Sequence, residues 1–346
     1  MAYRNQSVNT MIIFEKIHTV PTSEELINKA FKRAAKAMSA KNIENKHSRL
    51  MANESMVLTA SNIFTDSLAN IVRRFPSFDQ LPSFYYKLTN ILVGVEQLKM
   101  SLASVDWASK KIHEVARFYV VKIRDSEIPE PLRKEALGRI ASIIKSINKD
   151  LLFLNEARNA LRKLPDVRDE PTIVIAGYPN VGKSSFVAKV TGARPKIAPY
   201  PFTTKGVAIG HFSWEGVRYQ VMDTPGLLDR PMSERNNIEQ QAITAIQFLD
   251  AVVMFMIDPS ESCGYGIEDQ KHLLAEIQKN FNLPLLVVAN KSDKPEFRKI
   301  DEVVLNISTI TGEGIKEVID RLLKMIEEKC LSDSREELEK SPESDF

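Results

Sequence analysis

The sequence has little cysteine, and glycine is nearly missing from its first half. Only two cysteines occur in 346 residues, Cys263 and Cys330, and they form neither a disulfide framework nor a metal-ligand pattern. This usage argues against a disulfide-stapled scaffold and predicts a reducing, cytoplasmic compartment. Of the 13 glycines, only Gly94 and Gly138 precede residue 168. The two halves of the chain therefore differ in construction.

Long apolar runs are absent as well. The longest, Ala251–Ile257, has the length of a buried strand and falls far short of the roughly 18 residues of a membrane span. The first ten residues lack the apolar region of a signal peptide, and Met11 is an alternative start. We therefore expect no membrane partner. Separately, we expect the chain to be monomeric when free.

The net charge of +2 conceals a division. Residues 1–168 hold 27 Lys and Arg against 17 Asp and Glu, which is +10, whereas residues 169–346 hold 20 against 28, which is −8. Most charges of a helical bundle only line solvated faces, but an excess confined to one domain favours a polyanion such as RNA. The tail 331–346 is acidic and poor in apolar residues, so we expect disorder there.

Residues 1–168 are predicted to form an antiparallel helical bundle, because helical spacing recurs and no strand pattern intervenes. The first helix starts near Thr22 or Ser23, which can act as its cap. The other expected helices are Ser48–Phe75, Phe84–Leu98, Leu102–Ile123 and Leu132–Leu164. Five aromatic residues could stack on bases but are more often found in a core: Phe84, Tyr85, Tyr86, Trp107 and Tyr119.

From Pro171 strands and helices alternate, which predicts a doubly wound α/β domain over 169–330 with ligand loops at the carboxyl ends of its strands. The expected strands are Thr172–Ala176, Val207–Phe212, Arg218–Met222, Ala251–Ile257, Leu285–Ala289 and Val303–Ile307. The expected helices lie near Lys183–Val190, Ile238–Leu249, Ile267–Phe281 and Gly314–Glu328. The predicted fold class is therefore α plus α/β.

The stretch GYPNVGKSS fits the phosphate-binding loop template between a strand and a helix. Backbone N–H groups at such a helix start, with the helix dipole, make an anion site. Lys183 would reach the β- and γ-phosphates, and the Ser184 hydroxyl would ligate Mg²⁺. The candidate phosphate-binding residues are Gly177, Tyr178, Pro179, Asn180, Val181, Gly182, Lys183, Ser184 and Ser185.

The sequence NKSD after the strand Leu285–Ala289 predicts recognition of guanine. Asp293 can accept hydrogen bonds from guanine N1–H and the 2-amino group, neither of which adenine offers. Asn290 would brace the loop, and the Lys291 stem would pack over the ring. Ser308 and Thr309, after the last strand, lie where a backbone N–H would contact guanine O6.

DTPG after the strand Arg218–Met222 predicts the γ-phosphate and metal end of the site. Asp223 would hold Mg²⁺ through water, the Gly226 N–H would meet the γ-phosphate, and Thr204, favoured over Thr203, would complete the Mg²⁺ shell with Ser184. Arg230 and Arg235 could donate charge but are expected at the surface.

Catalysis is assigned to Lys183, Thr204, Gly226 and Asn180, the last as a candidate ligand of a monovalent cation such as K⁺. Leu227 follows DTPG where Ras-like enzymes place a water-orienting Gln. A slow intrinsic rate of hydrolysis to GDP and phosphate is therefore expected.

GYPNVGKSS, YPFTTK, DTPGLLDRP and VVANKSD together resemble the Obg-type GTPases, and most closely the Nog-type nucleolar GTP-binding proteins and their archaeal counterparts. The helical half shares this resemblance through VPTSEELI, FPSFDQLPSFYYKLTNIL and KEALGRIASIIKSI. The resemblance implies an assembly factor of the large ribosomal subunit that docks on precursor rRNA and ribosomal proteins. It also implies a nucleolar location for a eukaryotic member, whereas the missing C-terminal extension fits an archaeal one.

Two other functions are compatible with a GTP-binding domain beside a helical one. The first is a signalling or stress switch whose helical domain binds protein, and a one-sided cluster of Lys and Arg would argue against it. The second is a GTP-dependent RNA-modifying enzyme. Against it, the helical half has no cysteine, and His18, His47 and His113 are widely scattered.

Overall fold

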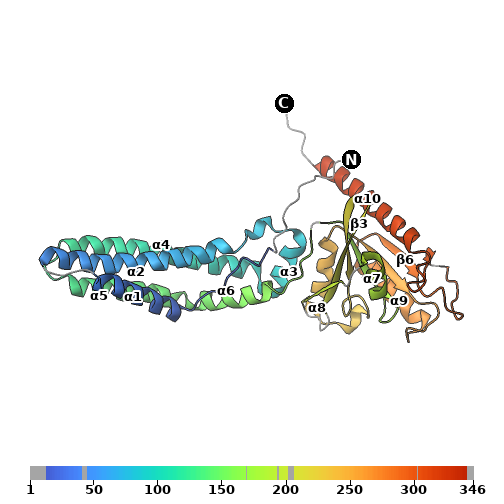
Figure 1. Cartoon of the computed structure of the whole chain (residues 1–346), viewed down its shortest axis with the longest axis horizontal. Coiled ribbons are helices and arrows are strands. Elements are labelled where there is room, and N and C mark those ends of the chain that lie inside the picture. The colour runs from blue at the N-terminus through green and yellow to red at the C-terminus, as the bar shows by residue number, and fades with distance from the viewer. Residues whose placement is uncertain are drawn as a thin grey trace, which may run out of the picture. The chain divides into compact units, whose positions relative to one another are not determined.

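A computed structural model of the chain describes residues 13–340, except 41–44, 169, 193–194, 202–205 and 302. These residues form two compact units. One contains the described residues up to Leu81 together with Leu92–Arg162, and the other contains Pro82–Ile91 together with the described residues from Lys163 onward. The predicted combination of a helical bundle with a P-loop GTPase fold is confirmed (Figure 1).

The helices of the first unit lie along one another, and each buries an apolar face. In the first helix the buried residues Leu26, Ala30 and Ala34 recur every fourth position. Thr22 is its cap: its hydroxyl accepts from the Glu25 N–H at 3.2 Å, and the Glu25 carboxylate accepts from the Thr22 N–H at 2.8 Å. The helices are α1 (Ser23–Ser39), α2 (Lys46–Arg74), α4 (Val95–Arg124), α5 (Pro129–Ser146) and α6 (Asn148–Leu161).

Two of the predicted helices end at other residues than expected. The single helix Leu132–Leu164 is two helices, because Ile147 has φ −93° and ψ 10°, outside the helical region. The Asn148 side chain there accepts from the Ser23 N–H at 3.1 Å, so a tertiary contact lies at the break. The helix expected to run to Leu98 ends at Val93, because Gly94 has φ +77°, a conformation that glycine readily adopts.

The second unit includes α3 (Ser83–Val93) up to Ile91, although this segment was expected inside the helical domain 1–168. Its aromatic side chains explain the difference. The Tyr85 hydroxyl accepts from the Val167 N–H at 2.9 Å and lies 2.9 Å from the Pro165 carbonyl oxygen. Phe84 faces Tyr200 with 6.5 Å between ring centroids. Tertiary contacts of this kind cannot be read from helical spacing.

The expectation that the aromatic residues belong to the core holds for most of them. Phe84, Tyr85 and Tyr119 are buried, whereas Trp107 is 53% exposed on α4. Trp107 is therefore the one of these side chains whose ring is largely open to a partner.

A mixed sheet organises the second unit, in the order β2-β3-β4-β1-β5-β6-β7. The strands from β4 to β7 run parallel, whereas β3 is antiparallel to both of its neighbours. β2 was not predicted, and β7 is shorter than expected. The strands are β1 (Thr172–Ala176), β2 (Lys196–Ala198), β3 (Val207–Trp214), β4 (Val217–Asp223), β5 (Ala251–Ile257), β6 (Leu285–Ala289) and β7 (Leu305–Asn306).

The helices of this unit are α7 (Lys183–Thr191), α8 (Asn237–Thr244), α9 (Ile267–Asn280) and α10 (Ile315–Lys340), with a 3-10 turn at Ala245–Phe248. α7 packs against β3 and β4, and α9 and α10 pack against β5. α10 extends as far as Lys340, into the segment from residue 331 for which disorder is expected. The Glu, Lys, Arg and Leu residues of this segment favour a helix.

Candidate nucleotide-binding site

The predicted phosphate loop connects the buried strand β1 with the start of α7. Three of its residues have the positive φ angles of a tightly turned loop: Gly177 at 132°, Asn180 at 63° and Gly182 at 111°. The Lys183 ammonium is buried beneath the loop and donates to the carbonyls of Gly177 and Tyr178 at 2.7 and 2.8 Å. The loop therefore holds the lysine beside the anion site that its sequence predicts.

The Gly182 position allows no side chain. A Cβ built there would lie 2.0 Å from the Asn290 Nδ2 atom, so the phosphate loop and the NKSD segment approach each other at this glycine. Asn290 Nδ2 also donates to the Val181 carbonyl at 2.8 Å. The two predicted motifs, more than a hundred residues apart, thus form one packed structure.

We expect Gly182→Ala to weaken GTP binding at least about tenfold and to lower the free energy of unfolding by about 1–3 kcal/mol, as overpacking does. Isothermal titration and denaturant unfolding measure the two effects. Gly192→Ala is the matched control, because Gly192 also has a positive φ, 64°, but open space around a Cβ. An equal loss of affinity in both variants would mean that backbone strain, and not the contact with Asn290, disrupts the site.

Ser184 and Asp223, two of the predicted Mg²⁺ residues, lie together. The Ser184 hydroxyl is 2.5 Å from Asp223 Oδ2, and Asp223 Oδ1 is buried with no hydrogen-bond partner within the described residues. Burial raises the pKa of Asp223 above its ordinary value. A hydroxyl beside a carboxylate oxygen that lacks a partner is a donor set suited to Mg²⁺. Thr203 and Thr204 lie outside the described residues.

The segment after Asp223 departs from the prediction in one residue. Arg235, expected at the surface, has a side chain only 2% exposed, and it donates to the Gly226 carbonyl at 2.8 Å. Its burial is explained by that bond and by Asp229, whose carboxylate lies 3.7 Å away. Arg230 is exposed, as expected. Asp229, which the sequence did not single out, accepts from the Gly226 N–H at 2.7 Å.

Leu227 is buried, with only 2% of its surface exposed. An aliphatic side chain has no group that could orient water, so the residue gives hydrolysis no help of the kind that a glutamine gives.

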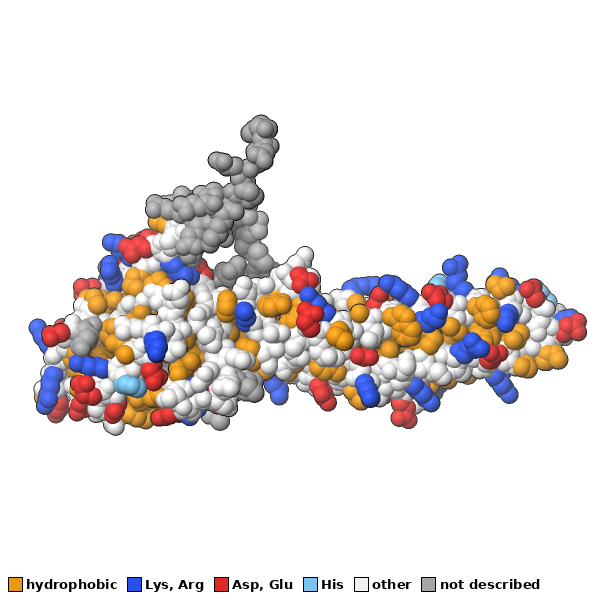
Figure 2. All heavy atoms as spheres, turned by 180° about the vertical axis from the view of Figure 1, so that it is seen from behind, with side chains coloured by type: hydrophobic (Ala, Val, Ile, Leu, Met, Phe, Trp, Pro, Cys, Tyr) orange, Lys and Arg blue, Asp and Glu red, His pale blue; other side chains and the backbone are white. Residues whose placement is uncertain are grey.

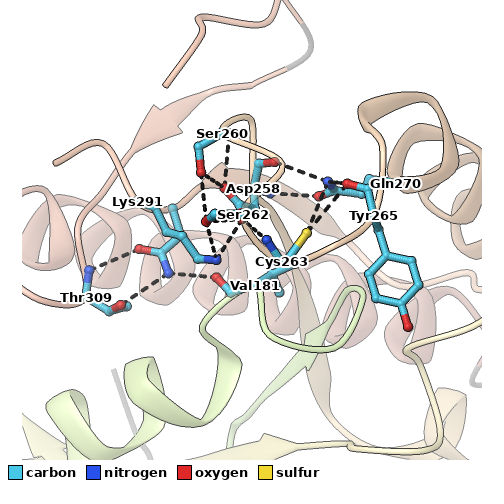
Figure 3. Close-up of polar contacts among 10 residues, drawn as sticks. Val181, Asp258, Ser260, Ser262, Cys263, Tyr265, Gln270, Lys291 and Thr309 are labelled. Carbon is cyan, nitrogen blue, oxygen red and sulfur yellow. Dashed lines mark hydrogen bonds and ion pairs between the residues drawn. The ribbon is translucent and has the colours of Figure 1, made fainter. Parts of the chain in front are cut away.

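The residues predicted to read guanine meet at the carboxyl ends of β6 and β7. Figure 3 shows two of them, Lys291 and Thr309. The Asn290 side chain is fully buried, donates to Thr309 Oγ1 at 3.2 Å and accepts from the Thr309 N–H at 3.0 Å. The exposed Asp293 accepts from the Ser308 hydroxyl at 2.5 Å. The NKSD segment and the Ser308–Thr309 turn are thus joined by side-chain hydrogen bonds, which orient the Asp293 carboxylate.

One residue that the sequence did not single out belongs to the same group. Asp258 follows β5 directly and is fully buried, and its Oδ2 atom lies 2.7 Å from the Lys291 ammonium. Its position after a strand is the signal that identified Asn290 after β6, and it could have been found in the same way.

Both halves of the chain match family models. Residues 14–168 match the NOG1 N-terminal helical domain, and residues 172–291 match a 50S ribosome-binding GTPase. A protein of Methanocaldococcus jannaschii, described as uncharacterized, is 41% identical over 286 residues, 81% of each chain. This chain belongs to the NOG1 family of GTPases.

Nucleolar NOG1-family members are also similar. Nucleolar GTP-binding protein 1 of Drosophila melanogaster is 37% identical over 328 residues, and that of Arabidopsis thaliana is 35% identical over 337. The alignments cover 88% of this chain and 50% of each relative. The chain thus spans about half the length of these nucleolar relatives.

Membership of the NOG1 family settles the general activity. The domain binds GTP, hydrolyses it to GDP and phosphate, and depends on Mg²⁺ as P-loop GTPases do. No helix in the described ranges combines the length and the apolar character needed to cross a membrane.

Proposed function

We propose that this chain is an assembly factor of the large ribosomal subunit, and that its helical unit docks on rRNA and ribosomal proteins. The observation that carries the proposal is the division of charge. Residues 1–168 have a net charge of +10, whereas residues 169–346 have a net charge of −8. The matched domain descriptions, a NOG1 helical domain and a 50S ribosome-binding GTPase, support the same partner.

α4 offers side chains suited to RNA. Lys110, Lys111, Arg117 and Lys122 are exposed along it, and Trp107 and Phe118 are each 53% exposed on the same helix. Cations neutralise phosphates, and aromatic rings stack on unpaired bases. Figure 2 shows Lys and Arg side chains spread over the visible face of the helical unit, with apolar patches between them.

In the proposed cycle GTP and Mg²⁺ order the segments that carry Thr204 and Gly226, and hydrolysis releases them. Lys183 and the phosphate-loop amides hold the phosphates, Ser184, Asp223 and Thr204 surround Mg²⁺, and Asn180 binds a potassium ion. Asn290, Lys291 and Asp293 select guanine. Without a water-orienting side chain at Leu227, hydrolysis is slow until the ribosomal particle stimulates it.

The test measures binding to immature large ribosomal subunits, and GTP hydrolysis in the presence and absence of these particles. We expect Lys110→Glu with Arg117→Glu to weaken particle binding and to reduce the salt dependence, because each phosphate contact removed lowers the salt slope by about one. The matched control is Lys316→Glu with Lys324→Glu on exposed positions of α10, an equal change of charge on the GTPase unit.

Three results bear on the proposal. Particle-stimulated hydrolysis that the α4 variant loses and the α10 variant keeps would support it, and a requirement for potassium over sodium would support the role of Asn180. Hydrolysis indifferent to the particle, with salt-insensitive binding, would instead favour a switch whose helical domain binds protein.

A further inference from the structure

The stretch Asp258–Gly266, between β5 and α9, belongs to none of the predicted nucleotide motifs. It is referred to here as the Asp258 loop. Figure 3 shows it beside the NKSD segment, with the Asp258 carboxylate at the centre of a set of polar contacts.

Asp258 is a buried carboxylate with a full set of partners. Its Oδ1 atom accepts from the Ser260 N–H at 3.0 Å and from the Ser260 hydroxyl at 2.6 Å, and its Oδ2 atom accepts from the Cys263 N–H at 2.8 Å. Its exposure is 0%. A buried charge with this many donors is fixed in one orientation.

The Ser262 hydroxyl also donates to Asp258 Oδ2, at 3.1 Å, and a further partner of Asp258 comes from the guanine end of the site. The Lys291 ammonium donates to Asp258 Oδ2 at 2.7 Å and to the Ser262 hydroxyl at 3.0 Å. Lys291 has a left-handed φ of 69°, so both its backbone and the end of its side chain are constrained. A lysine stem held at its far end presents its methylene groups in one place.

The Asp258 loop is also held by contacts with α9 and with the phosphate loop. The Gln270 side chain, on α9, accepts from the Asp258 N–H at 2.7 Å and donates to the Tyr265 carbonyl at 2.9 Å. The Tyr265 ring packs on Tyr178 of the phosphate loop, with 4.3 Å between ring centroids. One loop thus contacts both the lysine expected over the base and the loop expected around the phosphates.

We propose that Asp258 is a positioning residue for nucleotide binding, which holds the Lys291 side chain against the face of the guanine ring. The Asp258 loop then forms an additional wall of the nucleotide site. This inference rests on the placement of Lys291 over the base proposed above, and it is independent of the ribosomal partner.

The experiment is a double-mutant cycle on the full chain, with Asp258→Asn, Lys291→Ala and the double variant. The readout is the Kd of fluorescent GTP and GDP analogues. We expect Asp258→Asn to weaken both nucleotides about equally, by roughly tenfold, because the two share the base. In the Lys291→Ala background the same change should have almost no further effect. A residue that only stabilises the fold would instead give additive losses.

Two controls make the result decisive. Asp250→Asn, at the opposite end of β5, removes a surface ion pair with Lys329 and should leave both affinities unchanged. The ratio of the affinities for inosine triphosphate and GTP should be the same in Asp258→Asn as in the parent, because the 2-amino group that inosine lacks is the partner expected for Asp293.

The outcomes separate the two proposals. A normal Kd in Lys291→Ala would overturn the placement of the lysine over the base. A clear loss in Lys291→Ala with a normal Kd in Asp258→Asn would overturn the positioning role alone. Ser262→Ala removes the longer of the two Lys291 contacts and the Ser262 hydrogen bond to Asp258, and leaves the Lys291–Asp258 ion pair. It should give a smaller loss than Asp258→Asn and serves if that variant fails to fold.

Discussion

Asp293→Asn is expected to reverse the base preference of the site from guanine to xanthine. The aspartate is proposed to accept from guanine N1–H and the 2-amino group, and an asparagine presents a donor to one of them. Loss of such a matched pair of hydrogen bonds lowers affinity by about 10³-fold or more, so the affinity for GTP should fall by that factor. Xanthine carries an oxygen in place of the 2-amino group and can accept from the new amide.

The measurement is a competition between xanthosine and guanosine triphosphates, followed as hydrolysis and as binding. Asp301→Asn is the control, because Asp301 is an exposed aspartate of the same region, before β7. Equal losses for the two nucleotides would indicate that Ser308, whose hydroxyl lies 2.5 Å from Asp293, had been displaced and the turn had collapsed. Unchanged GTP binding would remove Asp293 from the site.

The elements that the sequence predicts well are those whose signal is local. The phosphate loop lies between β1 and α7 because a β-branched run precedes its glycines and a helix-compatible run follows them. The capping box at Thr22 likewise needs only the residues around it. Alternating strands and helices then place all the motifs at one edge of the sheet.

The features that the sequence misses depend on tertiary contacts. α3 packs within the GTPase unit because Tyr85 and Phe84 find partners at Val167 and Tyr200, far along the chain. Arg235 is buried because Gly226 turns a carbonyl toward it. Asp258 follows a strand, but only the fold shows that Lys291 reaches it. Helical spacing and strand patterns contain no information about such pairs.

Asp223→Asn is expected to have opposite effects on activity and on stability. Removing a carboxylate that is proposed to hold Mg²⁺ through water should lower metal affinity and GTP hydrolysis by about 10- to 100-fold. The asparagine should leave GDP binding in chelator nearly unchanged, since the phosphate loop amides remain. Hydrolysis titrated with Mg²⁺ measures the first effect, and Asp250→Asn, on the surface, is the control.

The stability effect follows from the pKa of Asp223, which burial raises. A carboxyl group whose pKa is raised by folding favours the folded state below the ordinary pKa of aspartate. This contribution is lost as the pH rises through the raised value, because the buried Oδ1 atom then carries charge without a partner among the described residues. In chelator, Asp223→Asn should therefore unfold at a higher temperature than the parent at neutral pH.

That advantage should shrink as the pH is lowered, and should be smallest below the ordinary aspartate pKa, where the parent carboxyl is protonated in both states. The unfolding temperatures of the parent and of Asp223→Asn across this pH range show directly which of the two is more stable. A variant less stable than the parent at every pH would mean that the Ser184 hydrogen bond outweighs the burial of the charge. If Asp223→Asn unfolds at the higher temperature in chelator, adding Mg²⁺ and GTP to the parent should remove this difference in unfolding temperature, because the metal supplies the partner that the buried carboxylate lacks.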